Sequence, residues 1–229
     1  VNIVNTEDLI SNYSTYVSSI KNTFRNGFWE LTSYRFIVIY EYMKQYNIKN
    51  IIHIENDILI YKNIDTIKFH NMHKLLLTMD SKNRCIPGLM FIPNDEILKK
   101  CLDKFNPSLN DMQNFSICYY KLNECIDTLP IFLEDNINDV TKMITKNFKY
   151  YEAIFDAAAV GQYLGGIDPK IKSGDTRGFI NETCIIDYSK YTFIWKNDNG
   201  KKIPYIIVNC NEYPIVNLHI HCKDLKRYM

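Results

Sequence analysis

The pattern of apolar and polar positions along the chain predicts a layered α/β protein. Between Trp29 and Tyr46 apolar residues recur at helical spacing, and this segment leads into the Ile-rich run from Ile51 to Tyr61. A continuous apolar run of this kind is typical of a parallel strand that helices cover on both faces. We therefore expect a helix that feeds a buried strand of a central sheet.

Shorter segments carry further strand and helix patterns. Strands are expected at 74–79, 88–92, 185–187, 206–208 and 216–220, and helices at 8–25, 95–105 and 151–164. No internal repeat or low-complexity linker divides the chain, so residues 1–229 are expected to form a single domain. Because the chain starts without Met at strand-like residues 1–4, we expect a piece of a longer protein.

Composition and charge narrow the class of protein. An apolar content of 46% is enough for a proper core, and 27 basic against 26 acidic residues create no field that would attract nucleic acid. Seven cysteines without a CxxC pair suggest reduced thiols, and hence the cytoplasm or another reducing compartment. No apolar run approaches the ~20 residues that span a bilayer. Motifs of P-loop, dinucleotide-binding, zincin and serine-hydrolase proteins are absent.

Two carboxylates interrupt the Ile-rich run. Glu55 and Asp57 lie two residues apart at its centre. Carboxylates are rarely buried unless they are paired or bind a metal, and hard oxygen ligands suit Mg²⁺ or Mn²⁺, which in turn bind nucleotide phosphates. The alternative is a surface pair that simply opens a turn after the strand.

A second candidate lies near the end of the chain, where His219, His221 and Lys223 alternate along a strand-like segment. Alternation places all three side chains on one face, where they could meet a cation or a phosphate. A solvated patch of His and Lys is the alternative interpretation.

Arg35 lies on the apolar helix that precedes the acidic run. A guanidinium on a largely buried helix needs an anionic partner, which is either an internal carboxylate (Glu41 or Asp57) or a bound phosphate.

Asp156 and two glycines mark the beginning and end of the helix expected near residue 160. Asp156 precedes three alanines and could serve as a base or an acceptor-orienting group, or as an N-cap or first-turn acid. Gly165 and Gly166 would allow a close backbone approach to a sugar, although such pairs commonly only end a helix.

Taken in order, these residues resemble the GT-A type of nucleotide-sugar glycosyltransferase over about residues 28–223. In that family an Arg-bearing helix precedes a strand that ends in a DxD motif, which the run Glu55, Asn56, Asp57 resembles. The apolar segment 87–91, the acid Asp156 and a late histidine follow in the family's order. The chain also resembles glycosyltransferases encoded by large DNA viruses. Glu in place of the first Asp is a departure that leaves Asp57 as the surer metal ligand. A second departure is that the first βα unit, which holds the nucleobase in the family, is expected to be incomplete at Val1.

The resemblance implies a Rossmann-like GT-A fold with a mixed, mostly parallel central sheet flanked by helices. It implies transfer of a hexose or deoxyhexose from a nucleoside-diphosphate donor, most favourably a UDP-sugar, to a glycan or glycoprotein acceptor. The cofactor would be Mn²⁺ or Mg²⁺, bound by Asp57, Glu55, His219 and His221. Donor or phosphate binding would fall to Arg35, Glu55, Lys223, Gly165 and Gly166. Asp156 would be the catalytic base if the reaction inverts the anomeric centre.

Two other classes remain open. A sugar-nucleotide nucleotidyltransferase also uses a metal and a related sheet, but it would carry a Gly-rich, basic loop after its first strand. A non-catalytic carbohydrate-binding module on a degenerate transferase fold could use tyrosines, Trp29 and Trp195 to stack on sugars.

Overall fold

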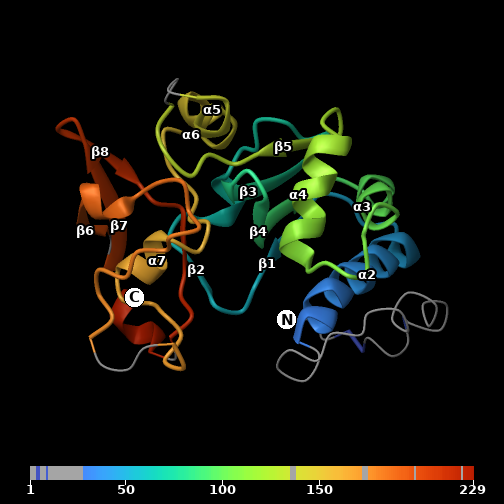
Figure 1. Cartoon of the computed structure of the whole chain (residues 1–229), viewed down its shortest axis with the longest axis horizontal. Helices are drawn as coiled ribbons and strands as arrows, with labels where there is room; N and C mark the ends of the chain where they lie inside the picture. The colour runs from blue at the N-terminus through green and yellow to red at the C-terminus, as the bar shows by residue number, and fades with distance from the viewer. Residues whose placement is uncertain are drawn as a thin grey trace. The chain divides into compact units, whose positions relative to one another are not determined.

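A computed structural model describes residues 4–5, 9, 28–134, 138–171, 175–198, 200–222 and 224–229. Most of the helix expected at 8–25 lies outside these residues. Within them, the elements occur in this order (Figure 1): α2 (Phe28–Tyr46), β1 (Ile51–Ile54), β2 (Ile58–Ile60), η3 (Ile64–Thr66), β3 (Leu75–Ser81), β4 (Arg84–Ile92), α3 (Asp95–Leu102), α4 (Asp111–Lys121), β5 (Ile126–Thr128), α5 (Asp139–Thr145), α6 (Phe148–Tyr151), α7 (Val160–Tyr163), η4 (Tyr188–Lys190), β6 (Thr192–Asp198), β7 (Lys201–Val208), β8 (Asn211–Pro214), β9 (Asn217–His219) and η5 (Leu225–Tyr228).

The chain divides into two compact units. Unit 1 comprises residues 1–53, 71–76 and 91–127, and unit 2 comprises residues 54–70, 77–90 and 128–229. The helices α2, α3 and α4 belong to unit 1, whereas α5, α6, α7 and the strands β6 to β9 belong to unit 2. The single domain expected from the sequence stays a prediction.

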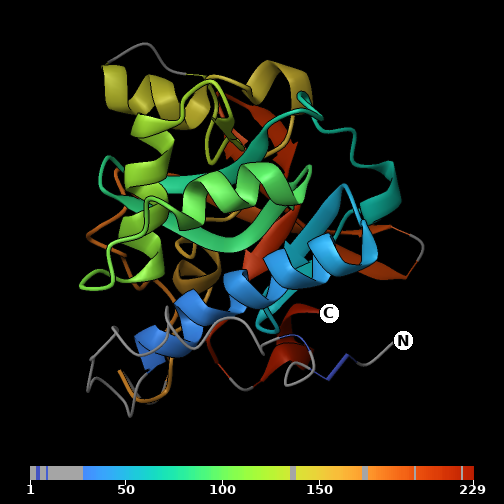
Figure 2. The ribbon, with the colours of Figure 1, turned by 90° about the vertical axis from the view of Figure 1, so that its right-hand side faces the viewer.

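The main sheet has four strands in the order β1, β4, β3, β5 and mixes parallel with antiparallel pairs. The expectation of a mostly parallel sheet is therefore wrong. The two residues between Ser81 and Arg84 join β3 to β4 as a hairpin, and so short a connection can only link antiparallel strands. The hairpin can be followed in Figure 1 and Figure 2. Its strands are almost wholly buried, whereas β1 lies at one end of the strand order and is half-buried, contrary to expectation.

The helix expected between Trp29 and Tyr46 is confirmed as α2, and α3 matches the start of the expected 95–105 helix. Asparagines begin three helices: the side chains of Asn94, Asn110 and Asn138 each accept a backbone N–H at the start of α3, α4 and α5. Such caps satisfy backbone donors that have no partner within the helix.

The prediction of one continuous helix at 151–164 is wrong for the residues between Tyr151 and Val160. The chain leaves α6 at Tyr151 and re-enters a helix at Val160, and between them Ala158 adopts the left-handed backbone region with φ 53°. The side chain of Asp156 accepts the backbone N–H groups of Ala159 and Val160, and these bonds outweigh the helix propensity of the three alanines. The strand expected at 185–187 is also absent, since this segment is irregular.

Unit 2 contains two small antiparallel sheets. The strand β2 pairs with β9, and β6, β7 and β8 form a three-stranded sheet in that order. The seven cysteines are all free thiols. None of the helices in the described residues is both long and apolar enough to cross a membrane.

Candidate metal centre

Pairing of β2 with β9 brings the acidic motif to the late histidines. In the antiparallel register Ile58 faces His219, and the backbone N–H of Ile220 donates to the carbonyl oxygen of Asp57 at 2.7 Å. Glu55 and Asp57 lie in the turn between β1 and β2, where the N–H of Ile58 donates back to the carbonyl of Glu55. Residues about 160 positions apart in the sequence thus meet within unit 2.

Four side chains converge at this point. Ligand atoms of Asp57, His219 and His221 all lie within 4.8 Å of one another. The Nε2 atom of His219 lies 3.2 Å from Asp57 Oδ1 and 3.3 Å from Glu55 Oε2. The rings of His219 and His221 meet edge to face with their centroids 4.7 Å apart. Glu55 therefore joins the three residues, and we call Glu55, Asp57, His219 and His221 the metal cluster.

The cluster is open to solvent on its Asp57 side. The side chain of Asp57 is 37% exposed, whereas that of His219 is 6% exposed. The buried Nδ1 atom of His219 has no hydrogen-bond partner in the described residues. Leaving a buried polar nitrogen unsatisfied costs about 1–3 kcal/mol, a cost that is typical of functional positions.

Mutual attraction shifts the pKa values of these groups. Burial lowers the pKa of His219, but the hydrogen bond and charge of Asp57 outweigh it and raise this pKa above 6.5. Burial raises the pKa of Asp57, yet the hydrogen bond and charge of His219 lower it overall. Burial and the neighbouring charge of His219 lower the pKa of His221. The carboxylates thus attract one positive charge, which a proton on His219 or a metal ion can supply.

Gly88, on β4, allows the close approach that the cluster needs. A Cβ atom at this position would lie 2.9 Å from His219 Cε1 and 3.0 Å from Glu55 Oε2. The carbonyl of Gly88 also accepts the N–H of Glu55 at 2.8 Å. Any larger residue would push the imidazole or the carboxylate out of place.

Asp156 occupies the capping role that the sequence left open. Its Oδ1 atom accepts the backbone N–H groups of Ala159 and Val160, both at 2.9 Å. Its Oδ2 atom accepts those of Gly161 at 2.8 Å and of His219 at 2.9 Å. Asp156 is 2% exposed, and its carboxylate binds the backbone at the start of α7 and in β9. These contacts give it a positioning role, and its predicted role as a catalytic base stays a prediction.

The two glycines after α7 also act on the backbone. Gly165, with φ 104°, follows the last turn of α7 and ends the helix. The carbonyl of Gly166 accepts the N–H of His221 at 2.7 Å, and a Cβ on Gly166 would lie 2.7 Å from the carbonyl oxygen of Gly161. Gly166 thus positions His221, and the side-chain amide of Gln162 lies 3.5 Å from His221 Nδ1.

The structure describes one of the two remaining predicted cations, Arg35, and this residue does not join the cluster. Arg35 pairs with Asp111 at 2.9 Å, and both residues belong to unit 1. The internal ion pair expected for Arg35 therefore exists, but its partner is neither Glu41 nor Asp57. Lys223 lies outside the described residues, so its predicted contact with phosphate stays a prediction.

Two glycines that are important for the cluster were not predicted from the sequence. Gly88 lies in an apolar strand, where nothing in the sequence indicates that His219 packs on it. Gly161 lies inside an expected helix, yet a Cβ there would come within 2.2 Å of the carbonyl oxygen of His219. In both cases a lone glycine within a regular element is a signal of close approach.

No family model, no curated protein and no solved structure matches this chain.

Proposed function

We propose that this chain is a metal-dependent glycosyltransferase that moves a sugar from a nucleoside diphosphate to a glycan or glycoprotein. The observation that carries the proposal is the meeting of the DxD-like motif with the late histidines. The sequence resemblance predicts that meeting, and Asp57, His219 and His221 offer ligand atoms within 4.8 Å of one another. A UDP-sugar is the favoured donor.

The residues of the metal cluster fit a divalent cation. Asp57 and Glu55 supply carboxylate oxygens, and His219 and His221 supply imidazole nitrogens. A set that combines two carboxylates with two imidazoles favours Mn²⁺ or another first-row transition ion over Mg²⁺, which prefers oxygen ligands throughout. We therefore propose Mn²⁺ as the cofactor.

Each residue has a distinct part in this proposal. A bound metal ion would offset the negative charge that develops on the departing diphosphate. Asp57, whose side chain is 37% exposed, would hold the ion where the donor can reach it from solvent. His219 and His221 are held by the Asp156 carboxylate and the Gly166 carbonyl. Preorganisation of this kind keeps the ligands in place before the donor binds.

The first experiment is calorimetric titration of UDP and GDP into the protein with and without Mn²⁺, since it requires no knowledge of the acceptor. We expect micromolar binding of UDP that depends on the metal. Asp57→Ala should abolish this binding, whereas Asp65→Ala, which removes an exposed carboxylate from the same segment, should leave it unchanged. Thermal unfolding of both variants checks that they fold.

A second assay separates the transferase from the two other classes. Release of UDP from UDP-sugars in the presence of glycan acceptors supports the transferase. Metal-dependent nucleotide binding without turnover would favour a carbohydrate-binding module, and pyrophosphate release from a nucleoside triphosphate and a sugar phosphate would favour a nucleotidyltransferase. Absence of nucleotide binding in every condition would overturn the proposal.

A further inference from the structure

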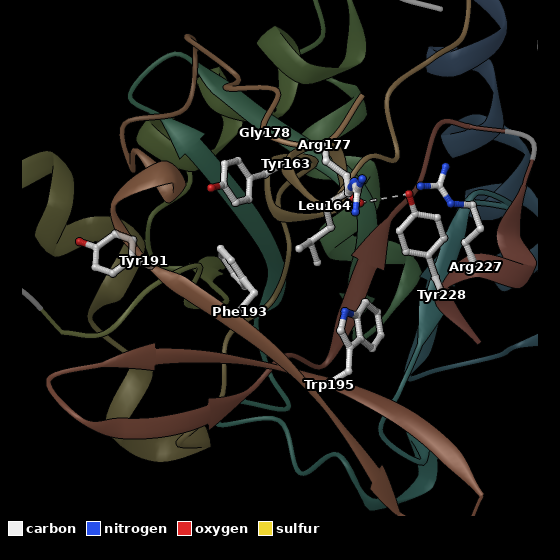
Figure 3. A pocket seen from close by; sticks show the side chains of 9 residues that line it. All are labelled: Tyr163, Leu164, Arg177, Gly178, Tyr191, Phe193, Trp195, Arg227 and Tyr228. Atoms are coloured by element: carbon white, nitrogen blue, oxygen red, sulfur yellow. Dashed lines mark hydrogen bonds between the residues drawn. The ribbon is translucent and has the colours of Figure 1, made fainter. Parts of the chain in front are cut away.

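Unit 2 contains a cavity of about 430 Å³ that no member of the metal cluster lines. One wall is an aromatic stripe. Phe193 and Trp195 lie on β6, and Tyr191 directly precedes this strand in extended conformation. Because successive side chains on an extended chain point to opposite faces, these alternating residues lie on the same face. Figure 3 shows the rings of Phe193 and Trp195 turned toward the same space. Trp195 is 37% exposed, an unusual amount for an indole whose role is only to fill a core.

The opposite wall comes from the end of α7 and the chain that follows it. Tyr163 and Leu164 end this helix, and the ring centroid of Tyr163 lies 5.5 Å from that of Phe193. The N–H of Gly178 donates to the carbonyl of Tyr163 at 2.7 Å, which ties the Arg177 segment to the helix. The cavity is thus framed by backbone that hydrogen bonds hold in place.

One side of the cavity is cationic. Both charged residues that line it are arginines, Arg177 and Arg227, and Figure 3 shows them beside Tyr228. Arg177 forms an ion pair with the carboxylate of Asp175, and the hydrogen bond from Arg177 lowers the pKa of Asp175 to about 2. Arg227 forms no ion pair with any residue that the structure describes. Of the two guanidinium groups, that of Arg177 is therefore paired with a carboxylate, and that of Arg227 has no such partner among the described residues.

Tyr228 completes this side as a neutral group. Burial raises the pKa of Tyr228 to about 12, so its hydroxyl keeps its proton, and it donates to the carbonyl of Leu164 at 3.4 Å. The ring of Trp195 lies 6.5 Å from that of Tyr228, which links the cationic side to the aromatic stripe.

We propose that this cavity binds a sugar ring that carries an acidic group, a carboxylate, phosphate or sulfate. The C–H face of the sugar would lie against the aromatic stripe, and the acidic group would meet Arg227 and Arg177. Aromatic faces suit the apolar face of a sugar, and the planar fork of a guanidinium matches the oxygens of these acids. The cavity also has a volume within the ~300–1,000 Å³ range of small-molecule sites.

The ring geometry favours a sugar over a nucleobase. A base held between two aromatic rings needs ring planes that are close to parallel. Here the planes of Tyr163 and Phe193 are inclined by 46°, and those of Trp195 and Tyr228 by 52°. These pairs cannot sandwich a flat base, whereas a puckered sugar ring needs only one aromatic face.

The cavity has a direct structural link to the metal cluster. Asp156 holds the first residue of α7, and Tyr163 at the other end of this four-residue helix, about 6 Å away, lines the cavity. If the proposed transferase activity holds, the acidic sugar is part of the acceptor. Binding of the sugar itself does not depend on that activity.

The test uses Trp195 as its own reporter. The chain has two tryptophans, so a Trp29→Phe background leaves Trp195 as the sole indole. Glucuronate, glucose 6-phosphate and glucose 6-sulfate are titrated with EDTA present, and glucose and AMP serve as comparison ligands. We expect a saturable change of emission with at least one acidic sugar, at an affinity at least tenfold higher than for glucose or AMP. Calorimetry of the same ligands detects binding independently of emission.

Three variants assign the binding to this cavity. Arg227→Gln should weaken the acidic sugar about tenfold or more and leave glucose unchanged, whereas Lys226→Gln, which removes the neighbouring exposed charge, should have no effect. Asp57→Ala should also bind the acidic sugar normally, which separates this proposal from that of the metal cluster. Failure of every acidic sugar in both measurements, equal affinity for AMP, or indifference to Arg227→Gln would overturn the proposal.

Discussion

The carboxylate of Asp156 offers the sharpest test of how the metal centre is built. It accepts four backbone N–H groups at 2.8–2.9 Å, three from the start of α7 and one from His219. In Asp156→Asn the side chain keeps its shape but loses one acceptor oxygen. The amide nitrogen that replaces this oxygen would face two N–H donors without satisfying them.

The magnitude follows from the two hydrogen bonds that the amide cannot make. A hydrogen bond to a charged group contributes about 1.5–3 kcal/mol, so the loss of two should lower the free energy of unfolding by about 3–6 kcal/mol. The total free energy of unfolding of a protein is typically about 5–15 kcal/mol. Asp156→Asn should therefore remove a large share of the stability of unit 2.

Urea unfolding followed by circular dichroism measures this loss. The matched control is Asp187→Asn, because Asp187 caps the short η4 helix at the surface and accepts one backbone N–H, from Ser189. The free energy of unfolding of Asp187→Asn should fall by about 1 kcal/mol at most.

A catalytic Asp156 would behave in the opposite way. A general base can become an amide with little effect on folding, while turnover falls by orders of magnitude. If Asp156→Asn unfolds at the same urea concentration as the parent protein and loses only sugar transfer, the positioning role is refuted and the catalytic base predicted from the sequence is supported.

Three further predictions follow from glycine packing and from the shifted pKa values. Gly161→Ala should lose about 1–3 kcal/mol of stability, since its Cβ would lie 2.2 Å from the carbonyl oxygen of His219; an unchanged melting temperature would contradict this packing. Burial, with the charge of Arg35, lowers the pKa of His53 to about 3, so between pH 6.5 and 3 the folded state resists a proton that the unfolded state binds. The parent protein should lose up to ~1.4 kcal/mol per pH unit on acidification, and His53→Leu should show a shallower slope in unfolding titrations. The raised pKa of His219 means that its pairing with Asp57 stabilises the metal-free protein below pH 6.5 and is lost as the pH rises through the folded-state value. Mn²⁺, which competes with that proton, should therefore raise the melting temperature more at pH 8 than at pH 6, and equal shifts would argue against His219 as a ligand.

The spacing of apolar residues predicts those helices and strands whose formation depends mainly on residues close together in the sequence. The α2 helix follows from apolar spacing, and the strand character of 74–79 and 88–92 follows from continuous apolar runs. The prediction of mostly parallel strands is wrong. The two-residue connection between Ser81 and Arg84 makes β3 and β4 antiparallel, and the pattern of apolar residues carries no information about that connection. The break before α7 is not evident from the apolar pattern. Its cause is the Asp156 side chain, which accepts backbone N–H groups beyond the first two alanines, and the apolar pattern does not record contacts between a side chain and the backbone.

The metal cluster could be predicted as a set of residues but not as a geometry. Alternation placed His219 and His221 on one face, and their rings are in contact. The pairing of β2 with β9 that brings them to Asp57 is a long-range choice of register, which sequence periodicity does not encode. For Arg35 the sequence predicts the need for an acidic partner but not which residue provides it. The partner is Asp111, at the start of α4, a helix that the apolar pattern does not predict.

The two proposed sites share a structural dependence on α7. Four residues are too few for a helix to be stable on its own, so α7 exists because Asp156 satisfies its first N–H groups and Gly165 ends it. Its first residues hold β9 through the shared carboxylate, and its last residue, Tyr163, lines the sugar cavity. A change that melts α7 should therefore disturb metal binding and acidic-sugar binding together, whereas Asp57→Ala and Arg227→Gln should each affect one alone.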